Sequence, residues 1–243
     1  MARYFIEVAY KGTEYAGFQI QQNANTIQAE IQKALHIYIR QVFVLTGSSR
    51  TDAGVHANQN YFHFDTDIQI DSDKTVYHLN AILPISIVVK KIFVVKNDAH
   101  CRFDAISRSY IYTIYQNKNP FLTETAFYYP YPLNKSLLDQ SANAILGSHN
   151  FQAFSKKNTQ VHTYQCTILS SEWHFEDNRI IYEVTGNRFL RGMVRGLVGT
   201  MLLVGKEKYS LQMFMDILES QTPSKTDFST PAKGLMLQSV IFP

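Results

Sequence analysis

The sequence has few of the features that mark secreted, metal-binding or membrane proteins. Its 243 residues contain two cysteines, Cys101 and Cys166, and neither belongs to a CxxC pair. A structural zinc site is therefore disfavoured, and a reduced protein of the cytoplasm is the simplest interpretation. No stretch approaches the roughly 20 apolar residues of a membrane span, and the first ten residues lack the pattern of a signal peptide.

Several catalytic signatures are also missing. The sequence has no GxSxG motif, which disfavours a serine hydrolase, and no GxxxxGK phosphate-binding loop. The candidate metal ligands His56, His63, His100 and Cys101 fit no zinc spacing, so solvated or core-edge histidines are the better interpretation. We therefore expect neither a metal nor a cofactor.

The composition is that of an ordinary globular protein, with 45% apolar and 18% charged residues. A chain of this length suits one large or two small domains. The net charge is only +3, and the whole excess of Lys and Arg lies after residue 107. A basic surface in the second half would attract a polyanion such as nucleic acid.

The first half has the element order βαββαβ. Alternating and β-branched stretches predict strands at residues 3–10, 41–46, 59–65 and 85–95. One helix is expected after the cap Asn25, with the apolar stripe Ile27, Ile31, Leu35 and Ile39. A second helix starts at residues 71–73 and must end before the proline at position 84.

The second half repeats this order with one added helix. Strands are expected at residues 109–115, 163–175, 179–185 and 235–242. Helices are expected from the cap Asn134 to Gly147, and at residues 187–204 and 210–219. The duplication predicts an α+β fold with antiparallel sheets covered by helices on one face. We place the domain boundary between residues 106 and 107.

Residues 48–57, with the sequence SSRTDAGVHA, form the stretch best suited to chemistry. Their composition is typical of a loop with a special backbone conformation. Arg50 puts a cation two residues from the candidate nucleophile Asp52. The alternative is a plain hairpin connection, in which Asp52 makes an Asx turn and Gly54 supplies a positive φ.

The predicted helix at residues 187–204 has an unusual polar face. At about 100° per residue, one sector holds Arg188, Arg191, Gly192, Arg195 and Gly199. Each glycine costs about 1 kcal/mol of helix stability relative to alanine. We therefore expect a ligand to approach the helix backbone while the arginines reach past it. The alternative is a neighbouring element packed on the glycines.

The loop at residues 48–57 and the arginines of residues 187–204 together suit a site for a phosphate-bearing nucleoside. Arginine binds phosphate with two parallel hydrogen bonds, and tyrosine offers a ring for stacking and a hydroxyl for proton transfer. A neighbouring arginine favours the charged form of an aspartate, which is the form that a nucleophile or base needs.

Four ordered motifs carry a resemblance that covers nearly the whole chain. The segments 49–57 (SRTDAGVHA), 103–112 (FDAISRSYIY), 187–195 (NRFLRGMVR) and 233–237 (KGLML) resemble the tRNA pseudouridine synthase A (TruA) family. The opening YKGTEYAGFQ at residues 10–19 is also similar. Two departures are Ser49, where the family usually has glycine, and Lys11, where an acidic residue is common.

The resemblance implies a role for particular residues. Asp52 matches the catalytic aspartate, Tyr110 the tyrosine that stacks on uracil and removes the C5 proton, and Arg195 the arginine paired with the aspartate. Arg50 matches the arginine that helps to hold the everted nucleotide. Arg188 and Arg191, which precede Arg195, are further substrate-binding candidates. Leu235 is a candidate for the apolar wall of the uracil pocket.

The resemblance also implies a fold and a substrate. The fold is two ferredoxin-like halves that form one extended, mainly antiparallel sheet. The enzyme is a homodimer without metal or cofactor that isomerises uridines at positions 38 to 40 of the tRNA anticodon stem-loop. Asp52 either attacks C1′ or removes a proton at C2′. The competing interpretation is a non-catalytic RNA-binding protein, although the chain lacks the RNP1-like segment of such modules.

Overall fold

The chain forms two compact units in a computed structural model that describes residues 1–156 and 161–243. The first unit consists of residues 1–106 together with 236–243, and the second of residues 107–235. Each contains a sheet and helices, which confirms the α+β class. The described residues include no helix with the length and hydropathy of a membrane span.

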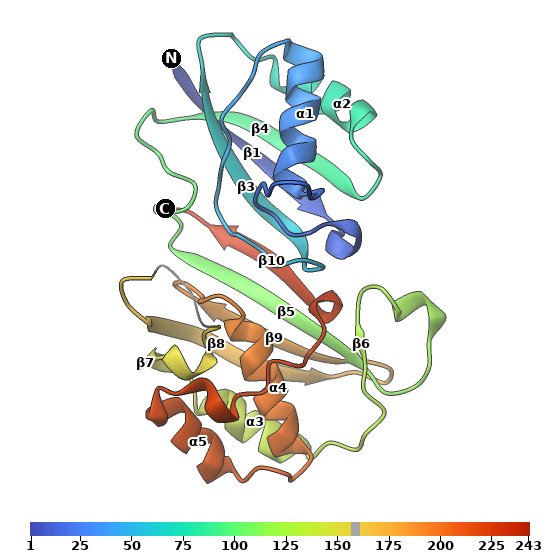
Figure 1. The fold of residues 1–243 in the computed structure, drawn as a ribbon, viewed down its shortest axis with the longest axis vertical. Coiled ribbons are helices and arrows are strands. Elements are labelled where there is room, and N and C mark those ends of the chain that lie inside the picture. Colours follow the sequence, from blue (N-terminus) through green and yellow to red (C-terminus); the bar gives the residue numbers. More distant parts are fainter. Residues whose placement is uncertain (157–160) are drawn as a thin grey trace. The chain divides into compact units, whose positions relative to one another are not determined.

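The sheet of the first unit has the strand order β4-β1-β3-β10 (Figure 1). The strands are β1 (Ala2–Tyr10), β2 (Thr46–Gly47), β3 (His56–Thr66), β4 (Ile87–Val95) and β10 (Leu235–Ile241). β1 pairs antiparallel with β3 and β4, whereas β10 pairs parallel with β3, with Met236 opposite His56. The last strand of the chain is thus built into the first unit.

Two helices, α1 (Ile27–Ile39) and α2 (Ser72–Ile82), cover this sheet (Figure 1). The predicted stripe is buried at its first three positions, Ile27, Ile31 and Leu35. The α1 cap is Thr26, whose hydroxyl accepts from Ala29 N at 3.3 Å, so the assignment to Asn25 was wrong by one residue. α2 begins as predicted, capped by the Asp71 side chain.

The strand predicted at residues 41–46 is mostly wrong, because only Thr46–Gly47 pairs with β3. The segment does alternate between buried and exposed side chains, with Phe43 and Leu45 inside. However, its carbonyl groups are hydrogen-bonded by glutamine side chains of α1: Gln32 Nε2 donates to Phe43 O at 2.6 Å and Gln28 Nε2 to Leu45 O at 2.9 Å. Side chains of α1, and not a neighbouring strand, therefore donate hydrogen bonds to these backbone carbonyl groups.

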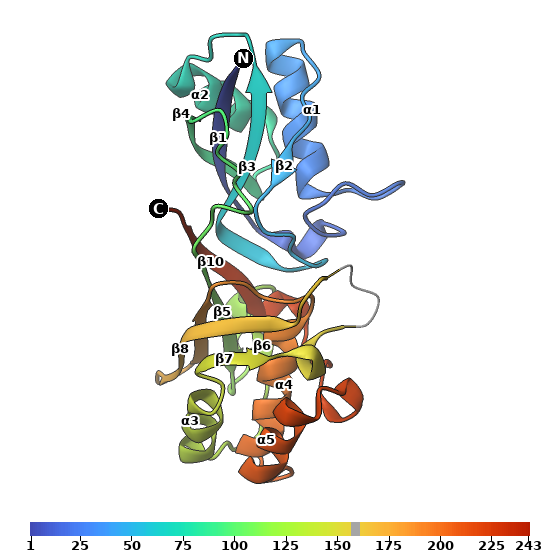
Figure 2. The same ribbon diagram turned by 90° about the vertical axis from the view of Figure 1, so that its left-hand side faces the viewer.

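The sheet of the second unit has the order β5-β9-β8-β7, with antiparallel neighbours (Figure 1). Its strands are β5 (Ser107–Tyr115), β6 (Phe127–Tyr128), β7 (Gly147–Asn150), β8 (Gln165–Phe175) and β9 (Ile180–Gly186). The helices on one face of this sheet are α3 (Lys135–Asn143), α4 (Met193–Gly205) and α5 (Leu211–Ser220) (Figure 2). Asn134 and Ser210 cap α3 and α5. Gly147 does not close α3; it starts β7 with a φ of +92°.

Candidate active site

Residues 48–55 connect β2 to β3 and are held by the backbone of a second loop. Phe18 N donates to Thr51 O at 3.1 Å, and Gly54 N donates to Tyr15 O at 3.3 Å. Within the loop, Val55 N donates to Asp52 O at 3.2 Å, which closes a tight turn around Asp52. The carboxylate of Asp52 therefore projects from a backbone that is fixed on both sides.

A buried polar network, formed by side chains of β1 and β3, supports the same loop. The side chain of Asn60 on β3 is completely buried; its Oδ1 accepts from Ser49 N at 3.2 Å, and its Nδ2 donates to Ser49 O at 2.8 Å. Asn60 Nδ2 also donates to the Tyr10 hydroxyl at 3.0 Å, and that hydroxyl lies 2.8 Å from Thr51 Oγ1. Strands β1 and β3 thus fix residues 49 and 51 on either side of Arg50.

Glycines allow the two loops to approach. A Cβ added to Gly12 would lie 2.0 Å from the carbonyl oxygen of Val55, so no side chain fits there. Gly12 N also donates to His56 Nδ1 at 3.0 Å, which gives His56 a structural role. Gly54 has a φ of +78°, as the hairpin interpretation predicted.

Arg50 is exposed and Asp52 is partly exposed, so both side chains can meet a ligand from solvent. Arg50 also lines a cavity of about 270 Å³ within the first unit. The loop therefore offers a cation and a carboxylate two residues apart, on a backbone held by its neighbours.

Tyr110 lies on β5 in the second unit, opposite Val184 of β9. Its ring packs edge-on against the ring of Phe189, with centroids 5.1 Å apart and an interplanar angle of 79°. The tyrosine is partly exposed. Phe189, which belongs to one of the motifs but has no proposed role, therefore sets the orientation of the Tyr110 ring.

Arg195 lies in the first turn of α4, where Thr230 fixes it at two points. Its Nε donates to Thr230 O at 2.7 Å, and Thr230 Oγ1 donates to Arg195 O at 2.9 Å. Beside it, the buried Tyr112 hydroxyl donates to Pro231 O at 2.8 Å. Burial raises the pKa of Tyr112, so this phenol stays neutral and anchors the segment.

The predicted helix at residues 187–204 starts six residues late, at Met193, because Gly192 adopts a φ of +74°. Asn187 N donates to Thr167 O at 3.0 Å, and this bond ties the preceding stretch to β8. Arg188 and Arg191 therefore lie in an irregular segment, and the shared arginine face that the helical wheel predicted was wrong.

Two of the glycines of α4, Gly196 and Gly199, have a packing role. A Cβ on Gly199 would lie 2.2 Å from Asp227 O, and one on Gly196 would lie 2.8 Å from the ring of Phe228. The element that approaches the α4 backbone is therefore residues 226–228 of the same unit, as the packing alternative predicted. Leu235 is buried at the start of β10.

The sequence analysis did not identify two residues that support the candidate site, Asn60 and Thr230. Asn60 alternates along β3 with the buried residues Phe62 and Phe64. A polar residue at such a buried position could have indicated a supporting role. Thr230 sits in an aperiodic stretch, and no pattern marked it.

The histidines and cysteine considered as metal ligands have other partners. His63 Nδ1 lies 3.2 Å from Cys101 Sγ, and that thiol donates to Thr46 O at 3.1 Å. Burial, with smaller effects of His100 and Arg3, lowers the pKa of His63 to about 4. In the described part of the chain, no three His, Cys, Asp or Glu side chains gather as a metal site would require.

Comparisons with known proteins agree with the motif resemblance. Residues 6–104 and 142–243 match the family described as tRNA pseudouridine synthase. The chain is 42% identical to the tRNA pseudouridine synthase A of Azobacteroides pseudotrichonymphae over 243 residues, which are 100% of this chain and 98% of the relative. It is 41% identical to the protein of that name from Bacteroides fragilis over 243 residues, covering 99% and 96% of the two chains. A Staphylococcus aureus (strain MRSA252) relative with this name is 37% identical over 240 residues, or 98% and 91%.

Proposed function

The chain belongs to the tRNA pseudouridine synthase family, and from this premise we propose that Asp52 drives the isomerisation of uridine to pseudouridine in the anticodon stem-loop of tRNA, at positions 38 to 40. The observation that carries this proposal is the Asp52 loop itself. Asp52 is the one acidic residue of segment 48–55, and it lies in a turn held by the backbone of residues 15–18 and by Asn60. A fixed carboxylate is what the reaction requires, because misplacement by about 1 Å costs on the order of 100-fold in rate.

The reaction rearranges one nucleotide without adding or removing atoms. The C1′–N1 bond of uridine breaks, the uracil turns within the pocket, and a C1′–C5 bond forms. The proton on C5 is lost, and N1 gains one. Asp52 either attacks C1′ or removes the C2′ proton, and both routes need its carboxylate in the charged form. The isomerisation needs no external oxidant or group donor, so this scheme includes no cofactor and no metal.

Tyr110 and Arg195 complete the proposed chemistry. We assign to Tyr110 the stacking on uracil and the removal of the C5 proton. Its contact with Phe189 supports this role, because a ring held by an edge contact keeps one face in a constant direction. Arg195 is assigned as the partner of the Asp52 carboxylate. Its attachment to Thr230 supports this role by fixing the direction of the guanidinium group.

The remaining candidates bind RNA in this proposal. Arg50 helps to hold the everted nucleotide, Arg188 and Arg191 bind phosphates, and Leu235 forms part of the uracil wall. Eversion of the target costs a few kcal/mol, and arginine–phosphate contacts compensate for it. We further propose that the enzyme works as a homodimer in the cytoplasm, as the family resemblance implies.

The test is the substitution Asp52→Asn, which keeps the shape of the side chain and removes its charge. We expect no pseudouridine when unmodified tRNA is incubated with this variant and mapped at single-nucleotide resolution. The dissociation constant for tRNA should stay within about twofold of the unsubstituted protein. Asp98→Asn, at an exposed aspartate of the same unit, is the matched control and should keep full activity.

Three results would count against the proposal. Pseudouridine formed by Asp52→Asn at the normal rate would remove Asp52 from the mechanism. Pseudouridine outside positions 38 to 40 would overturn the proposed target. A protein that binds tRNA but forms no pseudouridine would support the competing interpretation of a non-catalytic RNA-binding protein.

A further inference from the structure

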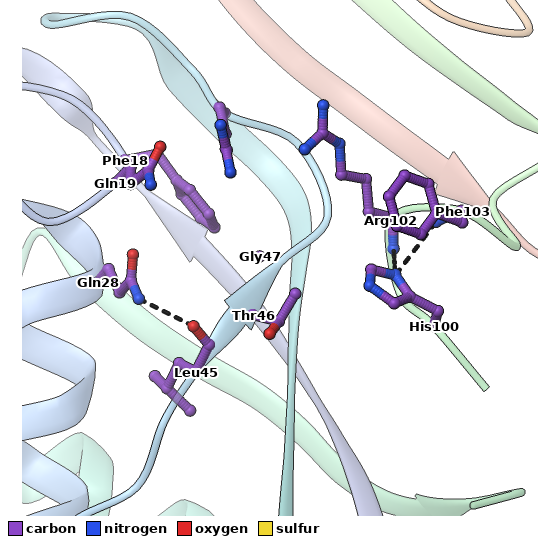
Figure 3. Close-up of a pocket in the computed structure, with 10 residues that line it drawn as sticks. Phe18, Gln19, Gln28, Leu45, Thr46, Gly47, His100, Arg102 and Phe103 are labelled. Carbon is purple, nitrogen blue, oxygen red and sulfur yellow. Dashed lines mark hydrogen bonds between the residues drawn. The ribbon is translucent and has the colours of Figure 1, made fainter. Parts of the chain in front are cut away.

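The cavity that Arg50 lines lies beside the Asp52 loop, within the first unit. This cavity of about 270 Å³ is bounded by the turn at residues 18–19, by α1, by β2 and by residues 100–103 (Figure 3). Arg50, two residues before Asp52, lines it as well. Any group bound in this cavity would therefore be a near neighbour of a group bound at Asp52.

The floor of the cavity is rigid. Gly47 of β2 packs so closely on Phe18 that a Cβ there would lie 2.1 Å from the ring. The ring of Phe18 stacks in turn on Phe62 of β3, with centroids 4.4 Å apart and an interplanar angle of 9°. Gln28 Nε2 donates to Leu45 O at 2.9 Å and closes the lower wall (Figure 3). The cavity is thus formed before any ligand arrives.

The rim combines aromatic rings with positive charge. His100 Nδ1 accepts from the backbone N–H groups of Arg102 and Phe103, at 3.1 and 3.3 Å (Figure 3). The rings of His100 and Phe103 lie 4.3 Å apart, and the Arg102 guanidinium carbon lies 5.6 Å from the Phe103 centroid. Phe103 is nevertheless 75% exposed, which is unusual for a large apolar side chain at the edge of a cavity.

The charges at the cavity have one sign. Arg50 and Arg102 line it, whereas no Asp or Glu is among its described lining residues. The nearby Asp104 carboxylate accepts from the backbone N–H of His100 at 2.7 Å, so it stabilises the turn. Two guanidinium groups beside an exposed ring match the phosphate and the base of a nucleotide.

We propose that this cavity binds one unpaired ribonucleotide next to the everted uridine, with its base on Phe103 and its phosphate between Arg50 and Arg102. The inference rests on the proposed function, because it takes the RNA at Asp52 as given. It adds a second nucleotide subsite that would help to keep the RNA strand open around the target.

The stacking contact can be tested at Phe103, because its side chain is mostly exposed and its substitution should leave the fold intact. We expect Phe103→Ala to weaken binding of an unmodified tRNA transcript at least fivefold in fluorescence anisotropy, which is the lower end of base–aromatic stacking. Phe103→Tyr keeps the ring and should stay within twofold. Equal affinities of the alanine and tyrosine variants would overturn the stacking contact.

A scan of the RNA then identifies the bound nucleotide. Each unpaired position of the anticodon loop is replaced in turn by an abasic nucleotide, and the Phe103→Ala effect is measured on each transcript. The effect should vanish at one position and persist at the others, because only one base is stacked on the ring. A Phe103→Ala effect that persists at every position would overturn the proposal.

The phosphate contact can be tested by the salt dependence of binding. Arg102→Ala should reduce the slope of log affinity against log salt concentration by about 0.7 to 0.9, the value for one phosphate contact. Arg179→Ala, an exposed arginine on the β8–β9 hairpin, is the matched control and should leave the slope unchanged. Equal slopes for Arg102→Ala and the unsubstituted protein would overturn this contact.

Pseudouridine formation by the unsubstituted protein is measured on the same transcript. If that activity is present and the Phe103 and Arg102 effects are absent, the subsite is wrong and the proposed function stands. If the activity is absent while both binding effects are present, the proposed function and the placement next to an everted uridine fail, while the binding of an unpaired nucleotide at Phe103 and Arg102 stands.

Discussion

Asn60→Ala should show how much the Asp52 loop depends on the side chain that supports it, because this substitution leaves Asp52 itself unchanged. The Asn60 side chain is completely buried and meets the backbone of Ser49 twice, through Oδ1 and through Nδ2. It also donates to the hydroxyl of Tyr10. Its Oδ1 also accepts from Tyr61 N at 2.9 Å. Alanine removes all four contacts and leaves the loop backbone at Ser49 without this partner.

The expected loss of stability follows from those contacts. A buried backbone group that loses its hydrogen-bond partner costs about 1–3 kcal/mol, and both the N–H and the C=O of Ser49 are affected. The Tyr10 hydroxyl keeps its contact with Thr51 Oγ1, so its contribution is smaller. We expect Asn60→Ala to lower the free energy of unfolding by about 3 kcal/mol. We also expect kcat to fall about 10- to 100-fold, because the backbone that carries Asp52 can shift.

Urea denaturation measures the first effect, and single-turnover pseudouridine formation on unmodified tRNA measures the second. The matched control is Asn58→Ala on the same strand, whose exposed side chain makes only a long contact of 3.5 Å to Gln238 O and a contact to Lys90 Nζ. The control should change stability by less than about 1 kcal/mol. The reasoning would be refuted if Asn60→Ala matched the control in both assays.

Two further predictions concern packing and pH. Gly199→Ala should destabilise the protein by about 1–3 kcal/mol although alanine favours helices, because its Cβ would lie 2.2 Å from Asp227 O; a melting temperature equal to or above that of the unsubstituted protein would contradict this. The pKa of His63 is lowered to about 4 by burial, so between pH 6.5 and pH 4 the unfolded chain takes up a proton that the native chain does not. Stability should therefore fall as the pH falls through that window. Urea titrations at several pH values should show that the free energy of unfolding depends less on pH in His63→Gln than in the unsubstituted protein. An equal pH dependence in both proteins would exclude His63 as the cause of the loss of stability.

Local sequence patterns predicted much of this protein. The 48–57 motif, with Asp52 beside Arg50, was recognisable because turn residues and reactive groups stand together in the chain. The cap Asn134 was also predicted correctly, and α2 and α5 begin within one residue of their predicted starts, since the start of a helix depends on the three or four residues after it. Most of the buried stripe of α1 followed from its spacing.

Tertiary structure decided the features that depend on distant partners. The 41–46 stretch has the alternation of a strand, but glutamine side chains of α1 donate to the carbonyl groups of Phe43 and Leu45. The start of α4 depends on Gly192, whose positive φ turns the chain where Lys156 packs against it. The glycines of α4 accommodate residues 226–228, a segment about 30 positions away that no periodicity connects to the helix.

The same distinction applies to the residues that support the site. The sequence by itself indicated the proposed chemistry, because the candidate reactive groups and their turn are local properties of the chain. Only the tertiary structure showed that Asn60 holds Ser49, that Thr230 holds Arg195, and that β10 pairs parallel with β3. Such contacts depend on which distant segments become neighbours when apolar side chains are buried. The spacing of residues along the chain does not predict which segments these are.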